Sequence, residues 1–275
     1  MVTIARIAKV FDELYPPHLA ESWDAVGLVC GDPSTDVRKV YFCVDVVADT
    51  VDEALTWGAD LVVAHHPLLL RGVTAIPTTT PKGRTLHRLI RAGAGLFVAH
   101  TNADSASPGV SDALAARLDL RDLRPLRPVP KQPIYGIGRI GTLPTPLRLA
   151  RLAELAAAAL PATPGGIRYT GDPDRLVRTV AVSGGAGDSY LGDATQAGVD
   201  AFLTADLRHH PASEHSEAGG PALLDAAHWA TEQPWLEQAA AALTERLAPA
   251  TVEVLVSDLV TDPWTRAVVP ARSSS

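Results

Sequence analysis

The 275-residue chain has little cysteine and few aromatic residues, with two Cys, one Met and an aromatic content of 5%. Two cysteines cannot form a disulfide scaffold in a chain of this length, and Cys30 and Cys43 lie among apolar residues, as buried free thiols commonly do. No apolar run approaches the roughly 20 residues that a membrane helix needs. The first residues also lack the apolar core of a secretory signal. These absences predict a cytoplasmic protein with no membrane partner.

Basic residues are also outnumbered. The chain has 24 Lys and Arg against 31 Asp and Glu, a formal net charge of −7. This balance argues against a nucleic-acid partner held by bulk attraction to phosphates. A hydrophobic content of 47% is that of a folded protein and excludes extensive disorder, and the length suits two modest domains.

Short apolar runs alternate with helical patterns along most of the chain. Runs of about five residues rich in valine predict buried strands, and amphipathic or alanine-rich stretches between them predict helices. This alternation is typical of an α/β protein with mixed, largely parallel sheets. Strands are expected at 37–47, 60–64, 95–99, 176–182, 200–204, 222–226 and 251–256, and helices at 49–57, 84–91, 110–118, 145–160 and 235–247.

A proline-rich stretch interrupts this pattern. Residues 121–133 contain prolines at 125, 128, 130 and 133. Proline removes an amide donor and disfavours helix in the residue before it, so we expect an extended, loop-like linker. The linker predicts a first α/β lobe over residues 1–125 and a second over 130–232. Residues 271–275 are expected to be a disordered tail, and the sequence shows no internal repeat.

Side chains that can bind metals follow four of the predicted strands, at the point where each strand ends. Ligands of open α/β sheets bind beyond the carboxyl ends of the strands, so we expect these side chains to share one site. They are His65 and His66 after 60–64, His100 and Asp104 after 95–99, Asp206, His209 and His210 after 200–204, and His228 and Glu232 after 222–226.

Histidine and carboxylate together are the ligands that a divalent transition metal prefers. The spacing of His228 and Glu232 places them on one face of a helix. His65 and His66 would point apart on a strand, so they are expected to serve two metals, with Asp104 and Glu232 as the available bridges. Taken singly, each histidine could instead be a structural residue bonded to the backbone.

Several segments resemble the signature motifs of the NGG-interacting-factor-three-like family, whose members are named GTP cyclohydrolase type-two homologues. Together the motifs span residues 21 to 232, nearly the whole chain. They are Glu21-Ser22-Trp23-Asp24-Ala25-Val26-Gly27-Leu28, Ala64-His65-His66-Pro67, His100-Thr101-Asn102-Ala103-Asp104 and Asp225-Ala226-Ala227-His228-Trp229-Ala230-Thr231-Glu232, with further similarity at 183–187 and 204–210.

The resemblance implies two divalent metal ions in a cleft between two α/β lobes, and a toroidal homohexamer. It implies a compact member without the domain that many relatives carry in mid-chain, with residues 233–270 returning to the first lobe. The resemblance favours Glu232 as the ligand that bridges the two metal ions. Carried over by position, the metal ligands are His65, His66, Asp104, His228 and Glu232.

Two close metals predict a hydrolase that uses a metal-activated water, and no separate Ser or Cys nucleophile is needed. The expected substrate is a nucleotide or another phosphorylated small molecule, with GTP as the case that the resemblance implies. His100, Asp206 and His210 are candidates to orient ligands or move protons, or else to cap strand ends. The turn at 184–187 could cradle a phosphate or be a tight turn.

Two other functions stay open: a metal-handling protein without turnover, and an interaction module with structural metals. A closed structural site is typically four-coordinate and rich in cysteine, which argues against the second. The ligand types suit Zn, Fe, Mn or Ni alike, so the sequence does not name the metal.

Overall fold

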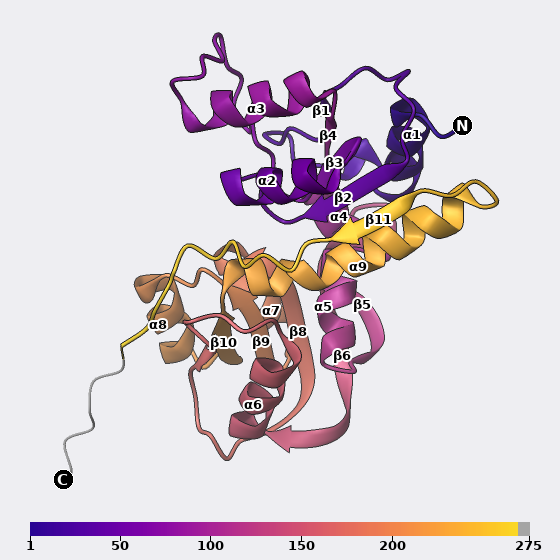
Figure 1. Ribbon diagram of the computed structural model, residues 1–275. Helices are drawn as coiled ribbons and strands as arrows, with labels where there is room; N and C mark the ends of the chain where they lie inside the picture. Colours follow the sequence, from indigo (N-terminus) through magenta and orange to yellow (C-terminus); the bar gives the residue numbers. More distant parts are fainter. Residues whose placement is uncertain (269–275) are drawn as a thin grey trace.

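Two mixed β-sheets organise the chain (Figure 1). The structure, a computed structural model, describes residues 1–268, so the predicted tail at 271–275 lies outside the described residues. In the first sheet, β4, β3, β2 and β11 are parallel, and β1 pairs antiparallel with β4 at the edge. The order across this sheet is β1 (Gly27–Cys30), β4 (Gly95–Val98), β3 (Leu61–Ala64), β2 (Lys39–Cys43) and β11 (Glu253–Val256).

The second sheet has three parallel strands at its centre, β8, β9 and β10, with antiparallel neighbours on both sides. Its order is β5 (Arg121–Val129), β6 (Gln132–Arg148), β8 (Leu176–Ala186), β9 (Ala201–Ala205), β10 (Ala222–Ala226) and β7 (Arg168–Tyr169). The predicted α/β class with mixed sheets is confirmed. Parallel pairings outnumber antiparallel ones only five to four among the described strands.

The proline-rich stretch is extended, as predicted, but it is a strand rather than a loop. Residues 121–129 form β5, which pairs antiparallel with β6 in a hairpin, and Pro133 lies at the start of β6. Prolines are tolerated here because β5 lies at the edge of the second sheet, where missing amide donors leave no neighbouring strand unpaired.

The helix expected from residue 145 begins later. Residues Leu147 and Arg148 still pair with Val177 and Leu176 of β8, so strand pairing overrides the local Thr-Pro signal. The helix forms only from Leu149, after this pairing ends.

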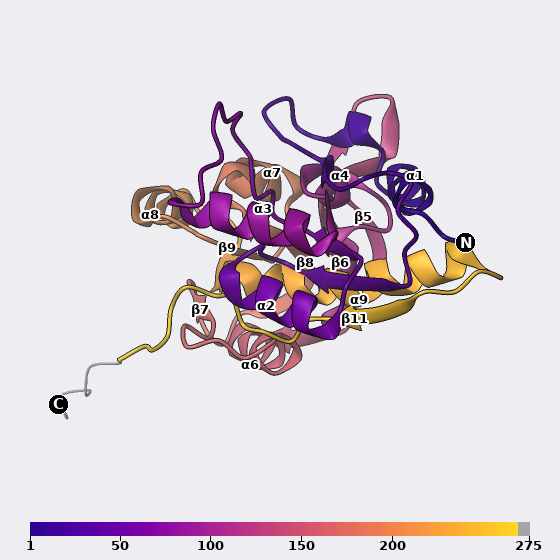
Figure 2. The same ribbon diagram turned by 45° about the horizontal axis from the view of Figure 1, so that its top comes forward.

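Helices cover both faces of each sheet, and Figure 2 shows α2 and α3 side by side on one face of the first sheet. None of the described helices is long and apolar enough to cross a bilayer. The helices are α1 (Ile4–Leu14), α2 (Ala48–Trp57), α3 (Pro81–Ala92), α4 (Thr101–Ser105), α5 (Val110–Arg117), α6 (Leu149–Ala159), α7 (Leu191–Ala197), α8 (His209–Glu217) and α9 (His228–Leu247), with short 3₁₀ turns η1 (Pro17–Leu19) and η2 (Asp188–Tyr190).

Strand alternation explains these layers. On β2, Val40 and Phe42 pack with α1 and α9, whereas Tyr41 and Cys43 face α2 and α3. On β9, Leu203 packs with α5 and α6, and its neighbour Phe202 faces α7. Each sheet is therefore buried on both faces, which is why its central strands are continuous apolar runs.

The two sheets repeat one β-α-β-α-β unit, which the sequence alone did not reveal. β2-α2-β3-α3-β4 in the first sheet corresponds to β8-α7-β9-α8-β10 in the second. In each unit a left-handed glycine ends the first helix, and an aspartate two residues later accepts hydrogen bonds from two amides near the start of the preceding strand. The pairs are Gly58 and Asp60, bonded by Arg38 and Lys39, and Gly198 and Asp200, bonded by Arg178 and Thr179.

The long helix α9 joins the two halves. It begins at His228, seven residues before the predicted start, and contains Pro234. Proline normally breaks a helix interior, but Trp229, Trp235 and Leu236 around it are buried in the core of the first half. The expected boundary between residues 232 and 233 falls inside this helix, and β11 after it pairs with β2.

Candidate metal centre

Two consecutive histidines follow β3, and a hydrogen-bond acceptor holds each ring. His65 is fully buried, and its Nδ1 donates to the carbonyl oxygen of Ala99 over 2.9 Å. His66 Nδ1 donates to Asp45 Oδ1 over 2.7 Å. Because Nδ1 carries the proton in both rings, Nε2 is the atom left to bind a ligand.

Glu232 receives both of these Nε2 atoms. It lies in the second turn of α9, with 3% of its surface exposed. Its Oε1 is 3.4 Å from His65 Nε2, and its Oε2 is 3.0 Å from His66 Nε2. Oε1 is also 3.0 Å from His228 Nε2, four residues earlier on the same helix, as the predicted spacing requires.

His228 is fixed in the same manner as His66. Its Nδ1 donates to Asp206 Oδ2 over 2.7 Å. Asp206 follows β9, so the second sheet orients a histidine whose Nε2 faces a pocket shared with the first sheet. This contact is the one that the orienting role considered for Asp206 requires, and the role itself stays a prediction.

Asp104 and His100 complete the cluster from the segment after β4. Asp104 Oδ1 lies 3.7 Å from His65 Nε2. His100 Nδ1 donates to Asp24 Oδ1 over 2.9 Å, and Asp24 also accepts a hydrogen bond from the amide of Thr101. The ligand atoms of His65, His66 and His100 lie within 4.8 Å of one another.

Three buried atoms in this cluster have no hydrogen-bond partner among the described residues: His65 Nε2, Asp104 Oδ1 and Glu232 Oε2. A buried polar atom left unpaired costs about 1–3 kcal/mol, so three of them in one place require an explanation. Two ligands bonded to one ion at about 2.0–2.2 Å lie roughly 3–3.5 Å apart. The observed distances of 3.0 and 3.4 Å between imidazole and carboxylate atoms fit that arrangement, so these residues fit a divalent metal.

The charges of the cluster shift its pKa values strongly. Burial opposes the charged form of both rings, but the charge of Glu232 and the hydrogen bonds to Asp45 and Asp206 raise the pKa of His66 to about 10 and that of His228 to about 11. Burial, together with the nearby charge of Glu232, raises the pKa of Asp104 to about 7. Against its own burial, the two cationic rings hold the pKa of Glu232 well below its usual value. The cluster thus concentrates opposite charges in a buried place, as metal sites do.

A glycine near the end of β8 approaches the cluster closely. A side chain on Gly185 would lie 3.0 Å from His228 Nε2 and closer still to Glu232 Oε1. The φ angle of Gly185 is +65°, a conformation that favours glycine. Gly185 therefore makes room for the carboxylate of Glu232.

The structure brings together all five candidate ligands named from the sequence, and His100 joins them. His209 and His210 are the exceptions: both lie exposed in the first turn of α8, and none of the hydrogen bonds or ion pairs between described residues links either to the cluster. The sequence does not identify Asp24 and Asp45 as orienting residues. Asp24 lies inside the motif Glu21–Leu28, whereas no sequence signal marks Asp45.

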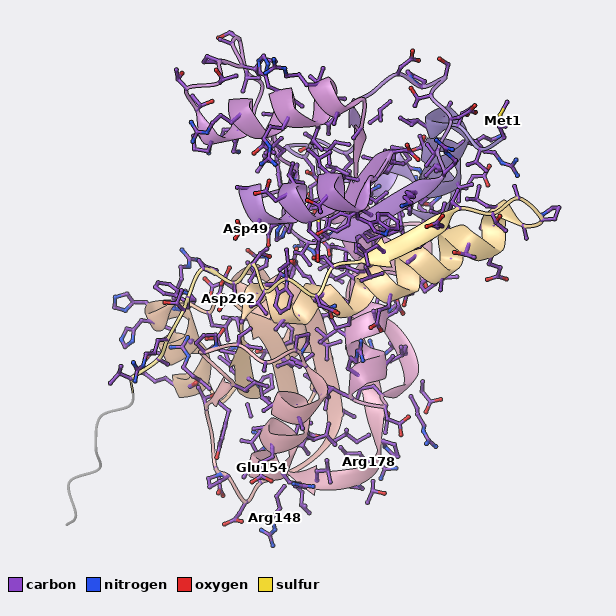
Figure 3. All side chains as sticks on the ribbon, viewed as in Figure 1. Met1, Asp49, Arg148, Glu154, Arg178 and Asp262 are labelled. Atoms are coloured by element: carbon purple, nitrogen blue, oxygen red, sulfur yellow. The ribbon has the colours of Figure 1, made fainter. Side chains whose placement is uncertain are left out.

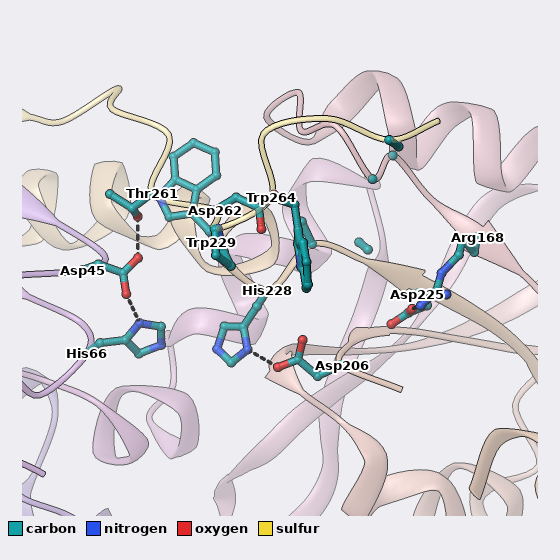
Figure 4. A pocket seen from close by; sticks show the side chains of 16 residues that line it. Asp45, His66, Arg168, Asp206, Asp225, His228, Trp229, Thr261, Asp262 and Trp264 are labelled. Atoms are coloured by element: carbon teal, nitrogen blue, oxygen red, sulfur yellow. Dashed lines mark hydrogen bonds and ion pairs between the residues drawn. The ribbon is translucent and has the colours of Figure 1, made fainter. Parts of the chain in front are cut away.

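A pocket of about 600 Å³ opens beside His66 and His228 (Figure 4). Asp45 and His66 line one side, and Arg168 and Asp225 of the second sheet line the other. The segment after β11 contributes Thr261, Asp262 and Trp264. Its volume is typical of small-molecule sites.

The sequence matches the family model described as Duf34/NIF3 (NGG1p interacting factor 3) over residues 2–263. A Streptomyces coelicolor protein named GTP cyclohydrolase 1 type 2 homolog is 54% identical and aligns with 100% of this chain and 98% of that protein. A Mycobacterium tuberculosis protein of the same name is 38% identical over 369 aligned residues, covering 96% of this chain and 97% of that protein. That alignment is longer than this chain, so the mycobacterial relative has residues without a counterpart here.

Solved structures share the fold. A Bacillus cereus protein related to NIF3 superposes with a TM-score of 0.90 at 24% identity, over 97% of this chain and 99% of that chain. A hypothetical protein from Staphylococcus aureus superposes with a TM-score of 0.89 at 25% identity, over 96% and 99%.

Proposed function

Because this chain belongs to the Duf34/NIF3 family, as its motifs predicted, we propose that it binds two divalent metal ions and hydrolyses a nucleotide or another phosphorylated small molecule. His65, His66, Asp104, His228 and Glu232 would hold the metals, with Glu232 between the two ions. The observation that carries the proposal is the set of three buried, unpaired ligand atoms that converge beside Glu232. Bound divalent ions would act as Lewis acids, lowering the pKa of a water molecule and stabilising negative charge on the substrate.

The protein's own residues prepare this chemistry. Ala99, Asp45 and Asp206 hold the Nδ1 atoms of His65, His66 and His228, so that each Nε2 faces the cluster. Such orienting contacts fix the tautomer of a ligand histidine and raise its basicity. The adjoining pocket gives a substrate direct access to His66 and His228.

The name of the relatives points to GTP as the first substrate to test. Opening the imidazole ring of a purine is hydrolytic and needs an activated water, which this site would suit. A phosphoester would suit it equally, so the assay should include both classes. His100 would bind metal or move a proton at this site, since its ligand atom lies within 4.8 Å of those of His65 and His66.

Metal content and a screen controlled by a variant test the proposal together. Purified protein should hold close to two divalent metals per chain, and metal-loaded protein should hydrolyse GTP or a member of a phosphoester panel. Glu232→Gln should lower both the metal content and the activity. Glu237→Gln, on the exposed side of the same helix where it pairs with Arg117, should change neither.

A native protein without metal would contradict the proposal. Activity that survives Glu232→Gln undiminished would belong to a contaminant. Stoichiometric metal with no turnover on any substrate would favour the metal-handling alternative.

We further propose that the protein works in the cytoplasm as a toroidal homohexamer, with residues 1–125 and 233–270 as one lobe and 130–232 as the other. Light scattering should give a mass of about six chains, and a monomer would contradict the assembly.

A further inference from the structure

The crossing segment, residues 257–268 after β11, runs from the first sheet to the second, and the proposed metal chemistry does not use it. Figure 1 shows it running over the start of α9 towards α8, and Figure 3 places Asp262 at the junction between the two halves. Ser257 fixes its start on the first sheet: the Ser257 amide donates to the carbonyl oxygen of Phe42 over 2.9 Å, and the hydroxyl donates to Glu53 over 2.7 Å. The crossing segment therefore starts from a fixed point before it reaches the pocket beside the metal centre.

Thr261 connects the crossing segment to a histidine of the metal centre (Figure 4). Its hydroxyl donates a hydrogen bond to Asp45 Oδ2, while Asp45 Oδ1 accepts the one from His66 Nδ1 over 2.7 Å. His66 Nε2 in turn lies 3.0 Å from Glu232 Oε2. Each oxygen of the Asp45 carboxylate thus has one partner, and a continuous chain of contacts runs from Thr261 to the cluster.

The hydroxyl of Thr261 fixes the Asp45 carboxylate independently of the ring that this carboxylate holds. Among the described residues, only Thr261 and His66 form hydrogen bonds with the Asp45 side chain. That side chain is 26% exposed, so water can take the place of a lost partner. Without the hydroxyl, the carboxylate and the imidazole would be free to turn together about their side-chain bonds, and the ring would lose its fixed direction.

The other two histidines with a held Nδ1 do not depend on the crossing segment. His65 donates to a main-chain oxygen, that of Ala99. His228 donates to Asp206, whose side chain is 57% exposed and has no second hydrogen-bond partner in the described part of the chain. Of these three rings, only that of His66 is held through a residue of the crossing segment, so a change at Thr261 should act on His66 selectively.

We propose that Thr261 is a positioning residue of the metal centre, which fixes the His66 ring through Asp45 and thereby raises the affinity for the ion that His66 binds. The inference rests on the proposed function, because it concerns one of the metal ions proposed there. Groups that orient a ligand histidine commonly change metal affinity by about 10–100-fold. Since the crossing segment also lines the pocket through Trp264, metal binding and the position of this wall are linked, and each should stabilise the other.

Cobalt titration tests this without relying on catalysis. Co²⁺ is added to the chelator-treated full chain, and its visible absorption spectrum follows the ions as they bind. Thr261→Val removes the hydroxyl and keeps the branched shape. One of the two Co²⁺ ions should then bind about tenfold more weakly, as the loss of an outer contact implies, and the other should bind as before. Thr261→Ser keeps a hydroxyl and should retain most of the affinity.

Trypsin digestion measures the reverse effect, that of the metal on the crossing segment. Arg266 is an exposed residue of this segment, so cleavage after it reports how often the segment leaves its place. Bound Co²⁺ should slow the cleavage in the unmodified protein and in Thr261→Ser, by up to about tenfold because the coupling is reciprocal. In Thr261→Val, Co²⁺ should leave the rate nearly unchanged.

Two controls carry comparable changes outside this chain of contacts. Thr251→Val changes an exposed threonine before β11, and Asp258→Asn changes an exposed carboxylate of the crossing segment. Neither residue is a hydrogen-bond partner of Asp45 or His66, so both variants should bind two Co²⁺ ions as the unmodified protein does. Circular dichroism checks that every variant is folded.

Three results would overturn the inference: unchanged Co²⁺ affinities in Thr261→Val, weakening of both ions to the same extent, or a Thr261→Ser variant as weak as Thr261→Val. The expected cobalt affinities in a protein that hydrolyses nothing would keep the role of Thr261 and remove the hydrolase. Two ions bound equally well in Thr261→Val, with hydrolysis intact, would do the reverse. A chain that binds no Co²⁺ would contradict both proposals.

Discussion

Gly185 lies against the carboxylate of Glu232, so closely that a side chain at position 185 would collide with it. The glycine cannot move away easily. Its amide donates a hydrogen bond to Thr231 over 2.9 Å, and its carbonyl oxygen accepts one from Thr204 over 3.0 Å. We expect Gly185→Ala to displace Glu232 and lower the affinity for divalent metal on the order of tenfold, as loss of outer contacts to metal ligands does. Metal titration of chelator-treated protein measures this.

Gly192→Ala is the control for that substitution. Gly192 lies in α7 with open space around it, so alanine should leave metal affinity unchanged and favour the helix slightly. Equal metal affinities for Gly185→Ala and the unmodified protein would show that the contact with Gly185 does not position Glu232 for metal binding.

The carboxylates that hold the histidine rings should affect metal affinity nearly as much as the proposed ligands do. Removing the charge of Asp45 or Asp206 weakens the hydrogen bond that fixes His66 or His228. Asp45→Asn and Asp206→Asn should each lower metal affinity by about 10–100-fold. Calorimetric titration with Mn²⁺ or Zn²⁺ measures this, and Asp258→Asn should bind metal normally. Unchanged affinity in both variants would show that these carboxylates do not tune ligands.

The candidate ligands could be grouped from the sequence because they lie at or shortly after the ends of successive strands. His65 and His66 come straight after β3, and Glu232 follows His228 four positions later, on the same helix face. Sequence spacing carries that information, since parallel strands end at one edge of a sheet.

The orienting residues could not be predicted in the same way. Asp24 holds His100 across 76 residues, and Asp45 holds His66 across 21. No period or motif spacing links positions that only tertiary folding brings together. The β-α-β-α-β unit that the two sheets share is not visible in the sequence for a related reason. Buried strands require only apolar residues, and the plainest signature common to the two units is a glycine followed two residues later by an aspartate.

Metal affinity should rise with pH. In the metal-free protein His66 and His228 have pKa values raised to about 10 and 11, and Asp104 has one raised to about 7. Both rings are therefore protonated at neutral pH, and a metal must displace a proton from each Nε2. Binding should release about two protons from the rings, with a further contribution from Asp104 below pH 7.

Calorimetry in two buffers of different ionisation enthalpy, between pH 6 and pH 8, measures this release. Glu232→Gln removes the charge that raises both histidine pKa values, so any residual binding should release fewer protons. A binding enthalpy independent of the buffer would contradict the expected displacement.

Truncation of Arg139 should lower the free energy of unfolding more than any other single truncation outside the metal centre. The Arg139 side chain is buried, its Nε and one terminal nitrogen contact Asp112 at 2.8 and 2.7 Å, and its other terminal nitrogen donates to the carbonyl oxygens of Gly136 and Gly138. Arg139→Ala leaves Asp112 without its partner, so it should lower the free energy of unfolding by about 3–5 kcal/mol. Urea denaturation measures the loss.

The comparison for Arg139 is Arg148→Ala. Arg148 lies at the far end of the second sheet (Figure 3) and forms an exposed ion pair with Asp174, so its loss should cost about 0–1 kcal/mol. Similar costs for the two variants would show that the buried pair is not structurally important.

Asp200 should make the stability of the second sheet depend on pH. Although burial opposes ionisation, the backbone amides of Thr179 and Arg178 donate to its carboxylate and lower the pKa of Asp200. A carboxylate with a lowered pKa stabilises the folded state above the pKa of the unfolded chain, about 3.9, and that stabilisation is lost as pH falls through the folded value. Asp200→Asn should therefore cost about 1–2 kcal/mol at pH 7, the value of a charged hydrogen bond in this setting.

The difference in unfolding free energy between Asp200→Asn and the unmodified protein should narrow as pH falls below about 3.9, because the unfolded chain binds a proton at position 200 before the folded protein does. Urea denaturation at pH 7, 5 and 3.5 follows that difference. The first sheet offers an internal comparison, because Asp60 accepts the same pair of hydrogen bonds from Arg38 and Lys39, and Asp60→Asn should also destabilise the protein at pH 7. A constant difference for Asp200→Asn across the three pH values would show that its hydrogen bonds do not depend on the charge of the carboxylate.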